Sequence, residues 1–261
     1  MTDEKSIIKI NVLPEKTTDA LLTPGATSIG SAFKDVIEAL GHATLGPLRK
    51  FNLVKEKELK DFEEQLNSKI NDIPEENRDD SKIGITFKAL EDSKYQLNED
   101  IMREAFSNLI SNSLDSRTNS LISPKYSDIL ANMSSNEAKL FQTIYQNNLG
   151  RVPVISVDIE NINTRSSRRA ADYILILNDK RILQDEQLSL SLLEASNLIR
   201  INEGKHWAAP HFISLYDYVE NEKVNLDSFN DPNFDEEKAI VNKHSLELTH
   251  LGLELAKLLF P

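Results

Sequence analysis

Residues 185–201 read DEQLSLSLLEASNLIRI, and LELTHLG follows later, at residues 246–252. The first stretch predicts a leucine-rich helix that leads into a β-branched strand. The second predicts a short strand and then a closing helix, for which Thr249 is a good N-cap because its hydroxyl can accept a backbone N–H. This order of elements resembles a winged helix. We therefore predict a winged-helix-like α+β region, with an irregular α+β domain as the alternative.

Other patterns extend this region over residues 123–261, with an acidic loop at 219–238. Ser134 or Ser135 is placed to cap a helix, and the β-branched run at 152–159 predicts a strand. The remaining elements predicted here are a short helix at 123–134, helices at 166–177 and 185–196, and candidate strands in 197–204 and 211–219, around the turn Glu203-Gly204-Lys205.

The first half of the chain predicts helices. Residues 1–24 read as an extended segment, and residues 25–122 as a helical region. Apolar residues at helical spacing predict helices at 55–72 and 83–95, and Asn98 is a plausible N-cap for a further one. The fold class expected for the whole chain is mostly α, with a small β part.

Composition sets limits on function. The chain has 261 residues, 39% of them hydrophobic, so a core can form. A formal net charge of −12 argues against a surface that binds nucleic acid throughout. The absence of Cys excludes disulfides and thiolate zinc sites. The start has no secretory signal and no run is long and apolar enough for a membrane span, so we expect a cytoplasmic protein, or one held peripherally at the inner face of the membrane.

No catalytic constellation is visible. Gly25 and Gly30 have the spacing of a phosphate loop, but Ser31 follows where the loop needs Lys. No Ser lies in a nucleophile elbow. Asp158 and Glu160 share one strand face without a partner base, so a solvated face is expected. No His pair has metal-ligand spacing, although His206 and His211 could meet across a wing. We expect no enzyme, cofactor or metal.

Two sets of residues are candidates for contacts. The first is basic and could bind an anion or a partner: Arg165, Arg168, Arg169, Lys180 and Arg181. DNA binding is disfavoured, because the helix expected to enter the groove, 185–196, holds Asp185, Glu186 and Glu194 and no Lys or Arg.

The second set is an amphipathic stripe, a candidate membrane or oligomer face: Ile29, Phe33, Val36, Ile37 and Leu40. The stripe is only about 16 Å long, too short to span a bilayer. Its outer face carries acids rather than the Lys and Arg typical of lipid-binding helices. We favour packing against the helices at 55–72 and 97–114, and membrane association of the segment 25–48 stays as an alternative.

Several longer stretches are similar to one known family. They are LGPL at 45–48, ALEDSKYQLNEDIMREAFSNLISNSLD at 89–115, SPKYSDILANMSSNEAKLF at 123–141 and LELTHLGLELAKL at 246–258. Together they resemble the bacterial abortive-infection alpha proteins, from about residue 20 onward. The resemblance implies phage defence, in which an infected cell stops growing or dies before the phage spreads. It supplies no catalytic residues.

The expected function is therefore a non-enzymatic, intracellular defence protein that acts through protein contacts. Its partner is an unknown host or phage protein, or a second copy of the chain. One alternative is a membrane-active effector that uses residues 25–48. Another is a winged-helix DNA-binding regulator that uses the basic set around Arg165 and Arg169.

Overall fold

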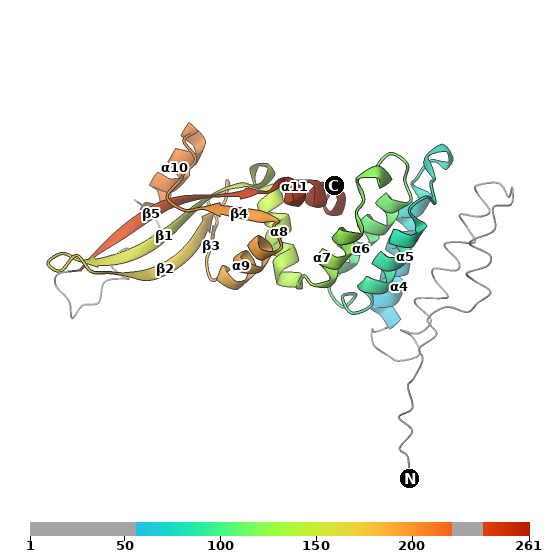
Figure 1. The fold of residues 1–261 in the computed structure, drawn as a ribbon, viewed down its shortest axis with the longest axis horizontal. Helices are drawn as coiled ribbons and strands as arrows, with labels where there is room; N and C mark the ends of the chain where they lie inside the picture. Colours follow the sequence, from blue (N-terminus) through green and yellow to red (C-terminus); the bar gives the residue numbers. More distant parts are fainter. Residues whose placement is uncertain (1–55, 221–236) are drawn as a thin grey trace, which may run out of the picture. The chain divides into compact units, whose positions relative to one another are not determined.

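The structure, a computed structural model, describes residues 56–220 and 237–261 (Figure 1). The chain divides into two compact units between Ser127 and Asp128. The described residues hold eight α-helices and one five-stranded antiparallel sheet. The fold is therefore mixed α+β, and the prediction of a mostly α chain with a small β part underestimated the sheet.

The first unit is helical in the part that the structure describes. Its elements are α4 (Glu56–Asn71), η2 (Glu75–Asn77), α5 (Ile83–Ser93), α6 (Asp100–Ser113) and η3 (Asn119–Leu121), and α7 (Pro124–Ala131) crosses the division. Helix α6 packs against both α4 and α5, and side chains such as Met102, Phe106 and Leu109 are fully buried. Helix α4 buries one stripe at helical spacing: Leu59, Phe62, Leu66 and Ile70.

The second unit is built on the sheet, with strand order β3-β2-β1-β5-β4. Its elements are α8 (Ser135–Gln146), η4 (Asn148–Gly150), β1 (Arg151–Asn161), β2 (Ser167–Ile176), β3 (Ile182–Leu183), α9 (Gln187–Ala195), β4 (Ile199–Asn202), α10 (Pro210–Tyr218), β5 (Glu237–Leu248) and α11 (His250–Leu259). Strand β1 lies at the centre, paired with β2 on one side and along its whole length with β5 on the other.

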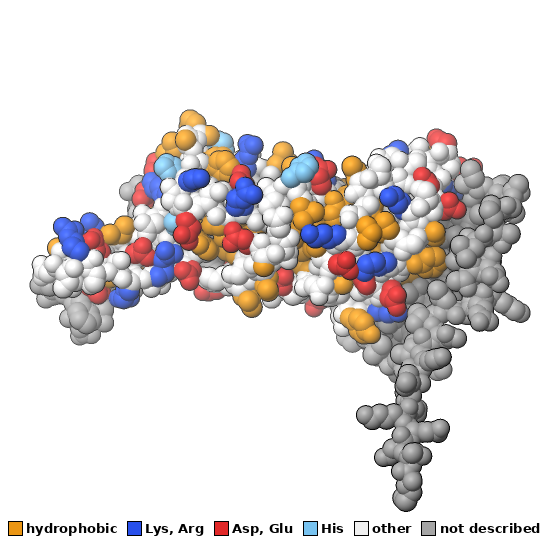
Figure 2. Space-filling view, in the orientation of Figure 1, with side chains coloured by type: hydrophobic (Ala, Val, Ile, Leu, Met, Phe, Trp, Pro, Cys, Tyr) orange, Lys and Arg blue, Asp and Glu red, His pale blue; other side chains and the backbone are white. Residues whose placement is uncertain are grey.

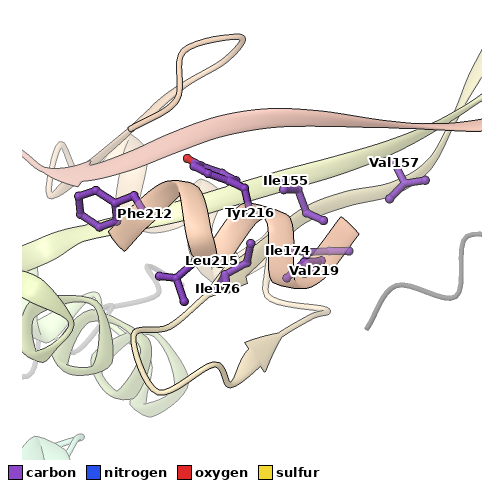
Figure 3. Close-up of a cluster of buried hydrophobic side chains, with 8 residues drawn as sticks. All are labelled: Ile155, Val157, Ile174, Ile176, Phe212, Leu215, Tyr216 and Val219. Carbon is purple, nitrogen blue, oxygen red and sulfur yellow. The ribbon is translucent and has the colours of Figure 1, made fainter. Parts of the chain in front are cut away.

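Helix α10 covers one face of the sheet. Its Phe212, Leu215, Tyr216 and Val219 pack against side chains of the strands, including Ile155 and Ile174 (Figure 3). Alternate residues of a strand point to opposite faces, so Val154 and Ser156 lie on the other side of β1. Helix α8 contacts β1, α9 and α11, and Phe141 of α8 meets Phe260 edge to face.

Many of the predicted elements are confirmed. Helices predicted at 55–72, 83–95, 123–134 and 185–196 correspond to α4, α5, α7 and α9, and the strand at 152–159 lies within β1. Ser134 caps α8 in a capping box with Glu137, and Thr249 caps α11. Helix α6 begins at Asp100, so its N-cap is Glu99 and not the predicted Asn98.

Two predictions are wrong: one predicted helix is a strand, and one predicted strand is a helix. Residues 166–177 were predicted to be a helix but form β2, because pairing with β1 outweighs the helix propensity of Arg, Ala and Leu. Residues 211–219 were predicted to be a strand but form α10. The predicted hairpin around the turn Glu203-Gly204-Lys205 is therefore absent from the described residues, where β4 pairs with β5 instead. The winged-helix arrangement is not confirmed.

The Thr-x-x-Gly sequence at the start of α11 allows a close backbone approach. The Thr249 hydroxyl accepts the N–H of Gly252, and the Thr249 N–H donates to the carbonyl of Leu198, 3.0 Å away. A Cβ on Gly252 would lie 2.0 Å from the same Leu198 oxygen. Only Gly lets the helix lie this close to the start of β4.

We predict that Gly252→Ala destabilises the protein by about 3 kcal/mol, because the methyl group forces α11 away from Leu198. Chemical denaturation followed by circular dichroism measures this. Gly84→Ala in α5 is the matched control: nothing lies within 4 Å of a Cβ there, so helix propensity should raise stability by roughly 0.5–1 kcal/mol. Equal stability of Gly252→Ala and the natural protein would contradict the account.

Candidate functional site

Strands β2, β1 and β5 continue as a three-stranded ribbon beyond the short outer strands. Strand β3 pairs only with Leu175 and Ile176, and β4 only with the part of β5 from Ser245 to Leu248. The far end of the ribbon holds the turn between β1 and β2, where Arg165 has a positive φ of 58°. Acidic and basic side chains are interspersed along the ribbon in Figure 2.

The structure separates the five predicted basic residues into two groups. Arg165, Arg168 and Arg169 lie at the far end of the ribbon, whereas Lys180 and Arg181 lie in the turn after β2. Residues 170–176 of β2 separate Arg169 from that turn, which is about 23 Å at an ordinary strand rise. The five residues therefore do not form one patch.

Arg169 is held by the strand beside it. Its Nε donates to Asp158 Oδ1 at 2.6 Å, and its second contact is to Asp172 at 3.5 Å. The other oxygen of Asp158 accepts from Asn242 Nδ2 at 2.7 Å, so one carboxylate joins β2, β1 and β5. The negative charge of Asp158 offsets the positive charge of Arg169 locally, which weakens the attraction of this guanidinium for a phosphate.

The other basic residues also have partners within the chain. Arg168 lies 3.2 Å from Glu237, and Arg165 lies 3.4 Å from Glu160. In the turn after β2, Arg181 pairs with Asp179 at 2.6 Å, and Lys180 Nζ lies 4.5 Å from the centre of the Tyr218 ring. The predicted shared face of Asp158 and Glu160 thus serves two arginines, one for each carboxylate.

A buried Ser–His pair, which sequence reasoning missed, lies on the ribbon face away from α10. Ser156 Oγ and His244 Nε2 are 2.8 Å apart, and both residues are buried. The N–H of Gly204 donates to His244 Nδ1 at 2.9 Å, so Nδ1 must be unprotonated and Nε2 bears the proton. Burial lowers the pKa of His244, which favours this neutral form.

This arrangement locks the sheet and does not activate a nucleophile. Because Nε2 donates its proton to Ser156, His244 cannot at the same time accept the serine proton, as a general base would. Tyr173 closes the site: its ring meets His244 edge to face, and its hydroxyl donates to Glu203. Burial, together with that hydrogen bond, raises the pKa of Tyr173 to about 12. The one hint of this site in the sequence is that Ser156 follows Val152 and Val154 at alternate positions of the β-branched run, so it shares their face of β1.

His206 and His211, the two histidines predicted to meet across a wing, each pack against a different aromatic ring. His206 packs its ring against Tyr216, and His211 packs against Phe212 at 3.9 Å between ring centres. Among the residues that the structure describes, no group of three or more His, Cys, Asp and Glu side chains could hold a metal ion.

The first unit has a polar groove between α4 and α6, with a volume of about 590 Å³. It is lined by Asp61, Glu64, Gln65, Lys69, Asp100, Arg103 and Glu104. Arg103 is buried there, and its two terminal nitrogens donate to the Leu97 carbonyl and to Asp100. Its Nε and the Oε1 of Gln65 have no hydrogen-bond partner among the described residues. These two atoms are closed off from solvent. Four carboxylates line the groove against the single ammonium group of Lys69, which donates to Asn108, so the lining disfavours an anion.

Helix α9 exposes leucines on the face turned away from the sheet. Leu190 and Leu193 are buried, whereas Leu188 is 73% exposed and Leu192 is 41% exposed. Apolar side chains lie at the surface over α9 in Figure 2. This helix is the one for which sequence reasoning disfavoured DNA contact.

Some predictions fall outside the described residues. The candidate membrane or oligomer face, Ile29, Phe33, Val36, Ile37 and Leu40, is one, as is most of the acidic loop at 219–238. Over residues 56–220 and 237–261, none of the helices combines the length and apolar composition needed to cross a bilayer.

The family resemblance is confirmed over most of the chain. Residues 54–259 match the family described as abortive infection alpha. The chain belongs to the abortive infection alpha family. Among curated proteins and among solved structures, none matches it. The match includes α6, α7 and α8, whose sequences suggested the resemblance, and it includes the Thr-x-x-Gly approach of α11.

For this abortive infection alpha protein we predict that Asp158→Asn/Glu237→Gln strengthens binding to duplex DNA by about threefold or more at ~0.1 M salt. The change frees Arg169 and Arg168 from their carboxylates. Fluorescence anisotropy with labelled DNA measures it. Asp72→Asn/Glu75→Gln changes the net charge equally in the first unit, at two exposed carboxylates, and is the control. Tight DNA binding by the natural protein, unchanged by the ribbon variant, would contradict the account of neutralised arginines.

The natural protein should also lose stability as the pH falls below about 6.5. Because the pKa of His244 is lower in the folded state, the unfolded chain binds this proton more readily. The contribution of neutral His244 is present above the unfolded pKa and is lost as the pH falls through that value toward the folded one. Denaturation midpoints at several pH values test this. His244→Gln should flatten the profile, whereas the exposed His250→Gln should not.

Proposed function

We propose that this chain is an intracellular bacterial phage-defence protein that acts by abortive infection, through contacts with other proteins rather than through catalysis. Membership of the abortive infection alpha family supports the biological role. The partner is a host or phage protein. This function needs a surface that other proteins can recognise, and it needs no cofactor.

The observation that supports action through protein contacts is that the arginines of the ribbon and His244 bond to other groups within the chain. The arginines of the ribbon are paired with carboxylates, and the proton on His244 Nε2 points at Ser156. These groups are satisfied within the chain, so they stabilise it rather than wait for a phosphate or a scissile bond. The exposed leucines of α9 have no such internal use, and apolar surface is what protein partners recognise.

Phage plating tests the proposal. Cells that carry the gene, alone or with its native neighbours, should give far fewer plaques than cells with an empty vector. Cultures should survive a low phage dose and collapse at a high dose, because infected cells die before the phage is released. No protection in either arrangement, across a broad phage panel, would sink the defence role.

A second arm addresses mechanism. A Ser156→Ala protein that remains folded should protect as well as the natural protein, since the role proposed for the hydroxyl is to accept a hydrogen bond from His244 and not to act as a nucleophile. Loss of protection by a stably folded Ser156→Ala would favour a catalytic role instead. Sedimentation of the natural protein with membranes during infection would favour the rival that uses residues 25–48.

A further inference from the structure

The outward face of α9 has the pattern of one half of a helix pair. Leu188, Ser191, Leu192 and Ala195 are exposed and fall at positions i, i+3, i+4 and i+7. Residues at this spacing form one continuous stripe on a helix. Two leucines with small residues beside them leave room for the side chains of an opposing helix. The opposite side of α9 already packs on α8 and lies beside β4.

The charged residues next to this stripe are all acidic. Asp185 and Glu186 precede α9, and Glu194 lies in its last turn. No Lys or Arg occurs between Arg181 and Arg200, and both of these arginines pair with carboxylates. Acidic side chains therefore flank the exposed leucines at both ends of the helix, with no Lys or Arg of this segment beside them. The carboxylate of Glu194 also accepts the backbone N–H of Ile201 in β4.

The negative charge around the stripe favours some binding partners over others. Anionic lipid and nucleic acid would be repelled by the carboxylates at either end. A second copy in antiparallel pairing would bring Glu194 against Asp185 and Glu186 of the first, and like charges in close contact are unfavourable. A basic helix gains both apolar burial and charge attraction.

We propose that the α9 face docks an amphipathic helix of a partner protein, with an apolar stripe flanked by Lys or Arg. The inference rests on the proposed function, since it names the class of partner for those protein contacts. Leu188 and Leu192 supply the apolar contact, and Asp185, Glu186 and Glu194 set the charge of the partner. Because α9 has only nine residues, the contact covers little more than two turns and depends strongly on these two leucines.

The direct test uses two designed helical peptides with identical leucine stripes, one flanked by Lys and Arg and the other by Glu. Binding to the full chain is measured by fluorescence anisotropy. The basic peptide should bind, more weakly as salt rises, and the acidic peptide should not. Leu188→Gln/Leu192→Gln should weaken the basic peptide at least about tenfold. Leu121→Gln/Ile213→Gln, which changes exposed leucine and isoleucine elsewhere, should leave its binding unchanged.

Several results would overturn the inference. They are equal binding of both peptides, equal loss in the two double variants, or self-association of the natural protein that Leu188→Gln/Leu192→Gln abolishes. A fall of several degrees in the melting temperature of the α9 variant would also overturn it, because the face would then be packed within the chain.

The plating assay separates this inference from the proposed function. If the natural protein gives no protection, the defence role fails whatever the peptides do. If it protects, Leu188→Gln/Leu192→Gln should lose protection while Leu121→Gln/Ile213→Gln keeps it. Full protection by the α9 variant would leave the defence role standing and overturn the docking face.

Discussion

The pairing of β1 with β5 is the constraint on which the second unit depends. Eleven successive residues of β1 find partners in β5, from Arg151 opposite Glu247 to Asn161 opposite Glu237. A slip of one residue would turn the side chains of β1 to the wrong faces and expose Ile155 and Val157, which pack under α10. The same register places Ser156 within hydrogen-bond distance of His244 and Asp158 beside Asn242. The buried polar lock and the burial of Ile155 and Val157 follow from this one alignment, and the pairing of β1 with β2 adds the ion pairs of the ribbon.

The charged groups and the apolar groups of this unit serve different purposes. On the ribbon, charges of opposite sign face each other across strands. Along the part of β2 that lacks a second partner strand among the described residues, such charges disfavour pairing with other chains. The register shifts in the β1–β2 pairing act in the same direction. On α9 the arrangement is reversed, with exposed leucines and carboxylates of one sign. The charged groups of the ribbon are thus occupied by contacts within the chain, whereas the leucines of α9 are exposed.

The sequence predicted α4 from its apolar spacing alone, and α8 and α11 from apolar spacing that agrees with the caps Ser134 and Thr249. It failed where propensity and spacing conflict. Phe212, Leu215, Tyr216 and Val219 are at i, i+3, i+4 and i+7, and Pro210 suits the first helical position, yet the β-forming residues between them suggested a strand. The Ser156–His244 pair could not be found, because 88 residues separate its members and only the sheet register brings them together. The arginines were found as a cluster, but their neutralising partners on β1 and β5 were not.

The place of β5 in the chain has a consequence for synthesis on the ribosome. Strands β1 and β2 emerge together and can form a hairpin, but β5 begins 76 positions after β1 ends, at Glu237 against Asn161. At 5–20 residues per second this leaves the second edge of β1 unpaired for about 4–15 seconds. During that interval the apolar residues destined for the core are open to chaperones and to neighbouring nascent chains. The amount of active protein in a cell is therefore sensitive to how fast the chain from the end of β1 to the end of β5 is made.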